Sequence, residues 1–295
     1  MESRRLPSSS SSEKKLKRRE ILEKKKAIDQ LIKAAYAQND HLDYFPPFRH
    51  FQRNGVCVHL ESGRGDKLSS SEKHYIQNLL KVNMEGPYGS EWPTEEKVKR
   101  REMVAPEARY IFVREGKPPN ASATEDKAPI VGFVHYRFTL EEEVPVLYVY
   151  ELQLEPRLQR KGLGKFLMQL IELIARKNCM GAVVLTVQKT NLLAMNFYLS
   201  KLRYIISSIS PSRVDPLTRV DKSYEILCKV VDQEYKTVLE VYHLNMVKTI
   251  MWSIAHSTCF ILSPLVHAGW RVDEQSRANF SLILGKFLRY ADYAL

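Results

Sequence analysis

Cysteine is scarce in this sequence and is not arranged for cross-linking. The 295 residues contain four cysteines, and no two of them form a Cys-x-x-Cys pair: Cys57, Cys179, Cys228 and Cys259. Paired spacing is typical of zinc ribbons and redox motifs, and dense, regular cysteines are typical of secreted disulfide frameworks. We therefore expect no metal site and no disulfide framework, and the scattered thiols favour a reducing compartment.

The first thirty residues lack the apolar stretch that a secretory signal requires. They instead hold ten basic and five acidic residues of a chain whose formal net charge is +11. The serine run Ser8–Ser12 predicts disorder, and the pattern from Glu13 to Tyr36 predicts a charged helix. Two interpretations of this basic segment, residues 1–36, stay open: nuclear import or docking on ribosomal RNA, and a solvated helix over the domain. We expect the protein in cytoplasm and nucleus.

Long uncharged runs are rare in this sequence, and one of them lies near the C-terminus. Thr249 to Trp270 contains no Asp, Glu, Lys or Arg, and its 22 residues are enough to cross a bilayer. Pro264, His256 and His267 dilute its apolar character, so we expect no membrane span. We predict one catalytic domain at residues 37–228, a dispensable helical extension of unknown role at 229–295, and a monomer.

The chain has only 12 glycines, and two of them lie in the run Gln159–Gly164, which reads Gln-Arg-Lys-Gly-Leu-Gly. The preceding stretch, Val146–Leu154, is rich in β-branched and aromatic residues and predicts a strand that Pro156 ends. The following stretch predicts an amphipathic helix from apolar residues at helical spacing: Leu163, Phe166, Leu167, Leu170, Ile171 and Ile174. A glycine pair alone is typical of an ordinary loop, but this context favours a functional one.

A phosphate cradle is the function that this context predicts. Glycine allows positive φ and close approach of the backbone, and the free N–H groups at a helix start attract anions. Arg160, Lys161 and Lys165 add positive charge at the same place. The dinucleotide fingerprint is excluded, because the third glycine and the acidic residue after a second strand are missing.

The run Gln-x-x-Gly-x-Gly between a strand and a helix resembles motif A of the GNAT superfamily of N-acetyltransferases. The resemblance continues in Val183–Val187, which looks like the fifth strand of that fold, and in Asn191, which looks like the start of the next helix. It implies an α/β (α+β) fold with a mixed central sheet flanked by helices. It also implies acetyl-CoA as the co-substrate.

The strand before the cradle is unusually acidic for a basic protein. Residues 141–155 contain five acidic side chains and no Lys or Arg, which favours a cationic acceptor, although a solvated hairpin tip explains Glu142 and Glu143 equally well. Glu151 lies among apolar residues, where an unpaired carboxylate would be costly. A protein α-amine is mostly protonated at neutral pH, so Glu151 is our candidate base, with Tyr148 and Tyr150 as nearby hydroxyls. A cysteine nucleophile is the less favoured mechanism.

A narrower resemblance joins five segments of the chain. Together they look like the N-alpha-acetyltransferase D (NatD) family, the histone-specific N-terminal acetyltransferases: Tyr88–Trp92, Tyr148–Glu155, Arg160–Leu167, Leu185–Val187 with Asn191, and Ser223–Leu227. This resemblance implies acetyl transfer to the N-terminal α-amine of histone 4 and histone 2A, whose tails begin Ser-Gly-Arg-Gly. The match runs from about Phe45 to Leu227.

The resemblance also implies roles for single residues. The coenzyme would be held by Leu152, Gln153, Leu154, Arg160, Lys161, Gly162, Leu163, Gly164, Lys165 and Asn191. The peptide would be bound by Tyr88, Trp92, Glu141, Tyr150, Thr186 and Tyr224. Catalysis would depend on Glu151, Tyr150 and Tyr148. For the aromatic residues of these sets, packing in the core is the alternative interpretation.

Three positions depart from the family pattern. Thr139 stands where the family has an acidic residue, and Ile209 stands where it has a serine that contacts the peptide. Tyr198 stands where many GNAT enzymes have a general-acid tyrosine, although this family tends to have Phe there. Two alternative functions therefore stay open: acetylation of lysine side chains or small amines by the same fold, and a non-enzymatic module that binds the ribosome or nucleic acid through the basic segment.

Overall fold

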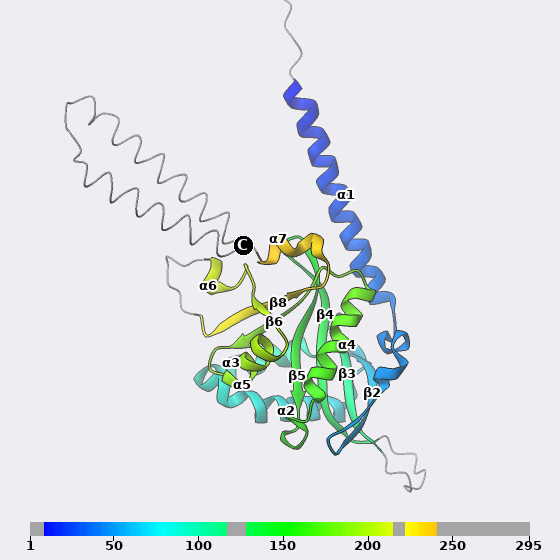
Figure 1. The fold of residues 1–295 in the computed structure, drawn as a ribbon, viewed down its shortest axis with the longest axis vertical. Helices are drawn as coiled ribbons and strands as arrows, with labels where there is room; N and C mark the ends of the chain where they lie inside the picture. The colour runs from blue at the N-terminus through cyan, green and yellow to red at the C-terminus, as the bar shows by residue number, and fades with distance from the viewer. Residues whose placement is uncertain (1–8, 117–127, 215–221, 241–295) are drawn as a thin grey trace, which may run out of the picture. The chain divides into compact units, whose positions relative to one another are not determined.

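The computed structural model describes residues 9–116, 128–214 and 222–240 (Figure 1). The described residues belong to one compact unit, and residues 241–295 lie outside the described part. The uncharged run at 249–270 is therefore not described. Across the described ranges, no helix is both long enough and apolar enough to cross a membrane.

A mixed sheet forms the centre of the fold, as the sequence predicts. Its strands are β1 (His50–Arg53), β2 (Val56–Arg64), β3 (Arg109–Glu115), β4 (Ile130–Glu141), β5 (Val144–Leu154), β6 (Ala182–Gln188), β7 (Ile205–Ile206) and β8 (Tyr224–Val230). They lie in the order β1-β2-β3-β4-β5-β6-β8-β7. Neighbours are antiparallel except β5 and β6, which are parallel because helix α4 (Leu163–Lys177) connects them.

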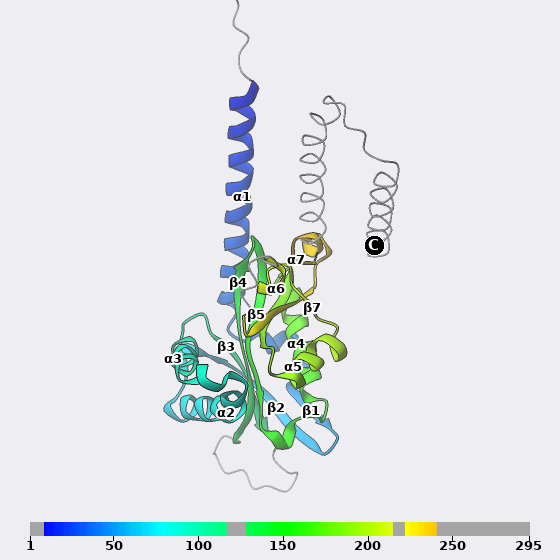
Figure 2. The same ribbon diagram turned by 90° about the vertical axis from the view of Figure 1, so that its left-hand side faces the viewer.

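Helices cover both faces of this sheet, as Figure 2 shows. Helices α2 (Ser70–Tyr88) and α3 (Trp92–Glu102) lie on one face, and Ile76, Leu79 and Leu80 of α2 pack with residues of β3 and β4. On the other face lie α4 and α5 (Leu192–Asn196), and the apolar side of α4 forms much of the larger core. The short helices α6 (Pro211–Val214) and α7 (Lys236–Glu240) follow near the end.

The basic segment forms helix α1, Ser9–Ala37. The helix begins earlier than expected, because the serine run predicted to be disordered contributes Ser9 and its successors to the first turns. Side chains from Lys15 to Ala27 are exposed, whereas Ile28 and Ala35 are buried against the domain. The outer half of α1 is thus a solvated basic helix, and the inner half belongs to the core.

The C-terminal boundary of the domain lies beyond residue 228. Lys229 Nζ donates to Glu172 Oε1 at 2.9 Å, and Leu239 of α7 is fully buried beside Val144 and Ala182. The backbone of Ser208 also donates to the carbonyl of Leu239 at 2.9 Å. Residues 229–240 therefore pack with the domain that we expected to end at 228, and the expectation that the extension is dispensable stays a prediction.

The sheet opens between its two parallel strands. The β5–β6 ladder ends at the pair Val149–Leu185, and both strands continue beyond it, β5 to Leu154 and β6 to Gln188. On its other side β5 stays paired with β4, where a bulge between His135 and Tyr136 shifts the register. The unpaired edge of β5 after Val149 is the place where the candidate site forms.

Candidate active site

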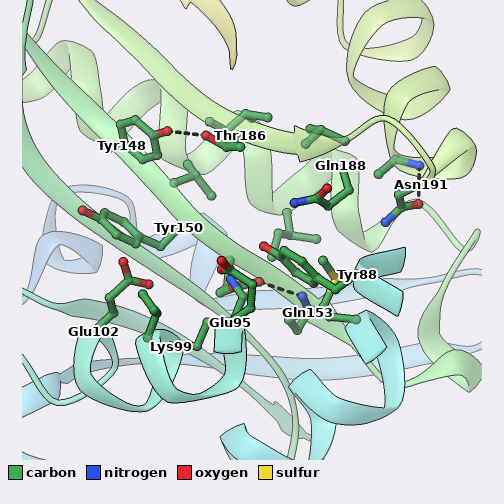
Figure 3. A pocket seen from close by; sticks show the side chains of 18 of the residues that line it. Tyr88, Glu95, Lys99, Glu102, Tyr148, Tyr150, Gln153, Thr186, Gln188 and Asn191 are labelled. Carbon is green, nitrogen blue, oxygen red and sulfur yellow. Dashed lines mark hydrogen bonds and ion pairs between the residues drawn. The ribbon is translucent and has the colours of Figure 1, made fainter. Parts of the chain in front are cut away.

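A cavity of about 400 Å³ lies where β5 and β6 separate. Its walls come from β4, β5, β6, α2, α3, the start of α5 and the π-helical turn Phe197–Lys201, and Figure 3 shows side chains of α3 pointing toward Tyr150 on β5. The lining includes most of the predicted acceptor and catalytic residues: Tyr88, Glu141, Tyr148, Tyr150, Glu151 and Thr186. Segments that are distant in the sequence thus meet here.

The predicted cradle forms the turn between β5 and α4. Arg160 and Gly162 both have positive φ, 59° and 92°, which leaves the backbone N–H groups of this turn and of the first residues of α4 without helical partners. Asn54 at the β1–β2 hairpin donates to the carbonyl of Lys161 at 2.9 Å and holds the turn. A Cβ on Gly164 would lie 3.3 Å from the ring of Phe197, so glycine lets α4 approach the turn after α5 closely.

This geometry suits the pyrophosphate and the extended arm of a coenzyme A. Gly162 provides a left-handed turn that a side chain would strain, the dipole of α4 favours an anion at its N-terminus, and the unpaired β5 edge offers backbone donors beside the cavity. Leu152 and Gln153 of β5 and Asn191 of α5 line the cavity directly. Residues 160–162 lie on the turn and residues 163–165 in the first turn of α4, all outside the cavity wall. Leu154 is buried in the core, and its carbonyl accepts from Asn83 and Gln159.

Glu151 lies inside the cavity wall with only 8% of its side chain exposed. One of its carboxylate oxygens accepts from Gln153 Nε2 at 2.8 Å, and Gln153 is in turn oriented by Asn83, which donates to its Oε1 at 2.9 Å. The other oxygen forms an ion pair with Lys99 of α3. The sequence did not identify this partner.

Lys99 is itself largely buried, with 12% of its side chain exposed. Its ammonium lies 5.3 Å from the ring centroid of Tyr88. Burial disfavours the charge, but the attraction of Glu151 and Tyr88 outweighs it and raises the pKa of Lys99 well above its ordinary value. Lys99 is therefore a permanent cation beside the candidate base.

Two tyrosines of β5 are held in different ways. The hydroxyl of Tyr148 lies 2.5 Å from Thr186 Oγ1, so these two predicted residues bridge β5 and β6 (Figure 3). Tyr150 has the guanidinium of Arg137 over its ring at 4.4 Å and stacks on His135 at 4.9 Å. Burial raises the pKa of both tyrosines, that of Tyr148 to about 12, so both stay hydroxyl donors at neutral pH.

Helix α3 supplies an acidic wall that the sequence analysis missed. Glu95 and Glu102 line the cavity on the same side as Lys99, and Glu141 lines it from the end of β4. Burial raises the pKa of Glu102 and of Glu141 above the ordinary range. The signal was present in the sequence, because Glu95, Lys99 and Glu102 are spaced four and three apart and so share one face of a helix.

Two predicted peptide-binding residues lie outside the cavity lining. Trp92 at the start of α3 is 3% exposed and packs with Tyr88, which is the core alternative considered for it. Tyr224 begins β8 opposite Gln188 and is half-buried. The serines on either side of Ile209 are used internally, because Ser208 donates to Val238 and Ser210 donates to Glu225.

Tyr198 lines the cavity from the turn after α5 and is 8% exposed. Burial, with Glu151 adding to it, raises the pKa of Tyr198 well above its ordinary value. It is therefore a protonated phenol that faces the same cavity as Glu151.

In the described ranges, no group of three or more His, Cys, Asp or Glu side chains could hold a metal ion.

The part of the chain that forms the cavity matches a known protein family. Residues 74–202 match the model of the acetyltransferase (GNAT) family, and this range includes α2 from residue 74 on, α3, the splayed strands, the cradle and α4. The match thus covers every element of the cavity wall.

Solved structures similar to this chain include three acetyltransferases. PaiA N-acetyltransferase from Thermoplasma acidophilum in complex with coenzyme A is 18% identical, with 58% of this chain and 98% of that chain covered and a TM-score of 0.39. The NatC complex bound to Gag peptide and CoA is 14% identical over 57% and 95%, with a TM-score of 0.38. Arabidopsis thaliana NAA60 with a bisubstrate analogue is 11% identical over 58% and 98%, with a TM-score of 0.39.

Proposed function

We propose that this chain, an acetyl-CoA-dependent acyltransferase with the GNAT fold, acetylates the N-terminal α-amine of histone 4 and histone 2A. The GNAT fold, the enzyme class and the acyl donor predicted from the sequence are confirmed by the family match. The acceptor is our proposal. One observation carries it: a buried carboxylate, Glu151, lies in a cavity whose wall holds three further carboxylates and opens beside the splayed strand.

The chemistry needs a base and no covalent enzyme intermediate. The coenzyme supplies an acetyl thioester, and the acceptor nitrogen attacks its carbonyl carbon while the carbon–sulfur bond breaks. The proton of the acceptor amine passes to Glu151, directly or through a water. A carboxylate offers about four acceptor positions, so Glu151 can receive the amine while Lys99 and Gln153 remain bound to it. Tyr198, as a protonated phenol, is placed to give a proton to the departing sulfur.

The charge of the cavity supports a cationic peptide terminus. Glu95, Glu102 and Glu141 line the cavity around Tyr150, and a tail that begins Ser-Gly-Arg-Gly brings an α-ammonium and a guanidinium. Opposite charges steer such a peptide to the site and fix its register. Thr139 leaves the family's acidic position neutral and does not line the cavity, whereas Glu102 and Glu95 of α3 provide carboxylates in its wall.

The basic outer half of α1 supports a partner with phosphate groups. Its exposed basic side chains are Lys15, Lys17, Arg18, Arg19, Lys24, Lys25 and Lys26. We propose that this surface contacts ribosomal RNA or chromatin, with action in cytoplasm and nucleus. Binding through phosphates weakens with added salt and does not depend on the coenzyme.

Acetylation of lysine side chains or small amines is the second candidate. The same base and donor geometry would serve it, and the acidic lining is equally attractive to a lysine ammonium. The α-amine and the lysine side chain differ in their ordinary pKa, which is about 8 for the α-amine and about 10.4 for the lysine. The α-amine loses its proton more readily, so a single weak base suits it better.

The test compares two peptides, one with a free N-terminal amine and one with that amine blocked and a lysine side chain as the remaining acceptor. The protein is incubated with acetyl-CoA and a peptide that begins Ser-Gly-Arg-Gly, and with the same peptide carrying a blocked N-terminus and an internal lysine. We expect acetylation of the free terminus only. Modification of the blocked peptide at a comparable rate would replace the proposed acceptor by the lysine side chain.

A further inference from the structure

Lys99 is a basic residue in an otherwise acidic cavity wall. Among the described residues that line the cavity, it alone is Lys or Arg, whereas four are glutamates. It approaches Glu151 from α3, a different element from the strand that carries the base. A cation at this point has a cost, because it opposes the binding of a cationic peptide. We therefore expect Lys99 to have a role at this position that offsets the weaker binding of a cationic peptide.

Two contacts fix the ammonium of Lys99. It is ion-paired with Glu151 and lies 5.3 Å from the ring centroid of Tyr88. The ion pair is more than four-fifths buried on both sides. A buried pair of this kind is costly to break, since the remaining charge would be left without a partner.

We propose that Lys99 is a positioning residue for acyl transfer, which acts through Glu151 by keeping its carboxylate charged and directed at the acceptor amine. This inference rests on the proposed function in one respect, that Glu151 receives the proton. Lys99 itself touches neither the acceptor nor the donor in this proposal.

The surroundings of Glu151 show why a cation is needed. Its neighbours are Glu102 on α3, Tyr88 on α2, Tyr110 on β3, His135 on β4 and Tyr198 after α5. Burial, helped by the nearby cations, lowers the pKa of His135 well below its ordinary value, so this ring is neutral at assay pH, and Arg137 lies over Tyr150 and donates to the Glu102 carbonyl. Among these neighbours and Lys99, Lys99 is the cation in ion-pair contact with the buried carboxylate, and a buried charge that loses its partner is costly.

The proton balance of the reaction makes the effect measurable. A base must be deprotonated before it accepts the proton of the amine, so the rate falls at acidic pH when the base is already protonated. An opposite charge within about 4 to 6 Å favours the charged form by about one to three pH units. Removal of Lys99 should therefore move the acid limb of the rate profile, and leave the alkaline end unchanged.

The experiment compares Lys99→Met, Lys99→Arg and the exposed neighbour Lys97→Met on the same helix. The rate constant kcat is measured at saturating peptide from about pH 5 to about pH 9, because kcat/KM would also report the titration of the free peptide amine. We expect Lys99→Met to move the acid limb to higher pH by about one unit or more, with rates that approach wild type at the alkaline end. Lys99→Arg and Lys97→Met should follow the wild-type profile. An equal loss at every pH, or no loss, overturns the proposal.

Two further measurements keep the inference separate from the proposed function. In the whole protein without coenzyme, the ¹³C carboxyl signal of Glu151, assigned by its loss in Glu151→Gln, is titrated with and without Lys99→Met. We expect the midpoint to rise by about one unit or more in the variant, and an unchanged midpoint refutes the role of Lys99 whatever the acceptor is. In the Glu151→Gln background, no carboxylate is present at position 151 for Lys99 to act on. Lys99→Met should then cause no further loss of activity, and an additive loss would contradict action through Glu151.

Discussion

The two halves of the active site are built in different ways. The donor half, residues Gln159–Lys165 with the start of α4, is one continuous segment, and its binding groups are mostly backbone N–H groups at positive-φ turns. The acceptor half gathers side chains from α2, α3, β4, β5 and β6 around Tyr150 and Glu151. The donor half presents the same groups to any coenzyme A thioester. The acceptor half presents side-chain charges, four glutamates and Lys99, which differ from the backbone groups of the donor half.

This difference separates what is generic in the enzyme from what is specific. Backbone groups are common to all residues, so a cradle is defined by where glycine allows the chain to turn. Side-chain charges depend on which elements pack together, and here α3 brings Lys99 and Glu102 to a strand 50 residues away in sequence. Substitutions in the two halves should therefore give distinct kinetic effects.

The largest expected effect is in the acceptor half, from Glu151→Gln. Loss of the base should lower kcat about a hundredfold or more, because general base catalysis contributes about 10² to 10⁴. Binding of coenzyme A, measured by calorimetry, should change little, since Glu151 lies outside the cradle. Glu143→Gln, at the exposed hairpin tip of the same strand pair, is the matched control. A weakened coenzyme affinity in Glu151→Gln would show that the acceptor half also contributes to coenzyme binding and would contradict the division into two halves.

The donor half should respond to Gly162→Ala. A side chain at φ 92° strains the turn by about 1 to 2 kcal/mol, which corresponds to roughly a tenfold loss of coenzyme affinity or a local rearrangement of the cradle. The peptide KM at saturating coenzyme should stay near wild type. Gly86→Ala is the control, because Gly86 lies in helix α2 with open space around its Cα. Equal losses in both variants would show that the turn has no special part in coenzyme binding.

A smaller effect is expected from Glu102→Lys in the acidic wall. Reversal of this charge should raise the KM for a Ser-Gly-Arg-Gly peptide about fivefold, with less effect when the arginine is replaced by alanine. Glu96→Lys on the same helix is the control, since Glu96 pairs with Arg100 and does not line the cavity. Because burial raises the pKa of Glu102, the wall should also lose charge earlier than an ordinary glutamate as the pH falls. The preference for arginine should then weaken at acidic pH.

The smallest effect is expected from Tyr198→Phe. The phenol is protonated throughout the assay range, and the thiolate can also take a proton from solvent, so kcat should fall only about threefold. The acid limb of the pH profile should not move. A loss above about a hundredfold would make Tyr198 an obligatory general acid and give the donor half a catalytic side chain of its own.

Sequence patterns predicted the elements around the donor half closely. The apolar spacing of residues 163–174 predicted α4, the run Val183–Val187 lies within β6, and Asn191 caps α5 as expected, accepting from Ala194 N at 3.1 Å. These patterns are local, because caps, glycine turns and amphipathic spacing each depend on residues within a few positions of one another. The serine run failed as a predictor, since helix α1 extends through it.

The acceptor half was predicted only in part. Glu151, Tyr148 and Thr186 were identified and do lie together, but Trp92 is packed in the core and Lys99 was overlooked. A charged residue on a polar helix usually belongs to its solvated face, and although helical spacing puts Lys99 on one face with Glu95 and Glu102, it does not show that this face is buried. Only the packing of α3 against β5 makes Lys99 a buried partner of the base and leaves Lys97 in water.

The sequence by itself determined the glycine turn and helix start of the predicted cradle, and which strand carries the candidate base. A phosphate cradle depends on backbone turns that adjacent residues dictate. The tertiary structure decided the electrostatic state of that base, because the charges that act on Glu151 come from α3, and their effect depends on burial and on distances of a few ångströms. It also decided that residues 229–240 belong to the domain, since only the folded core shows Leu239 fully buried.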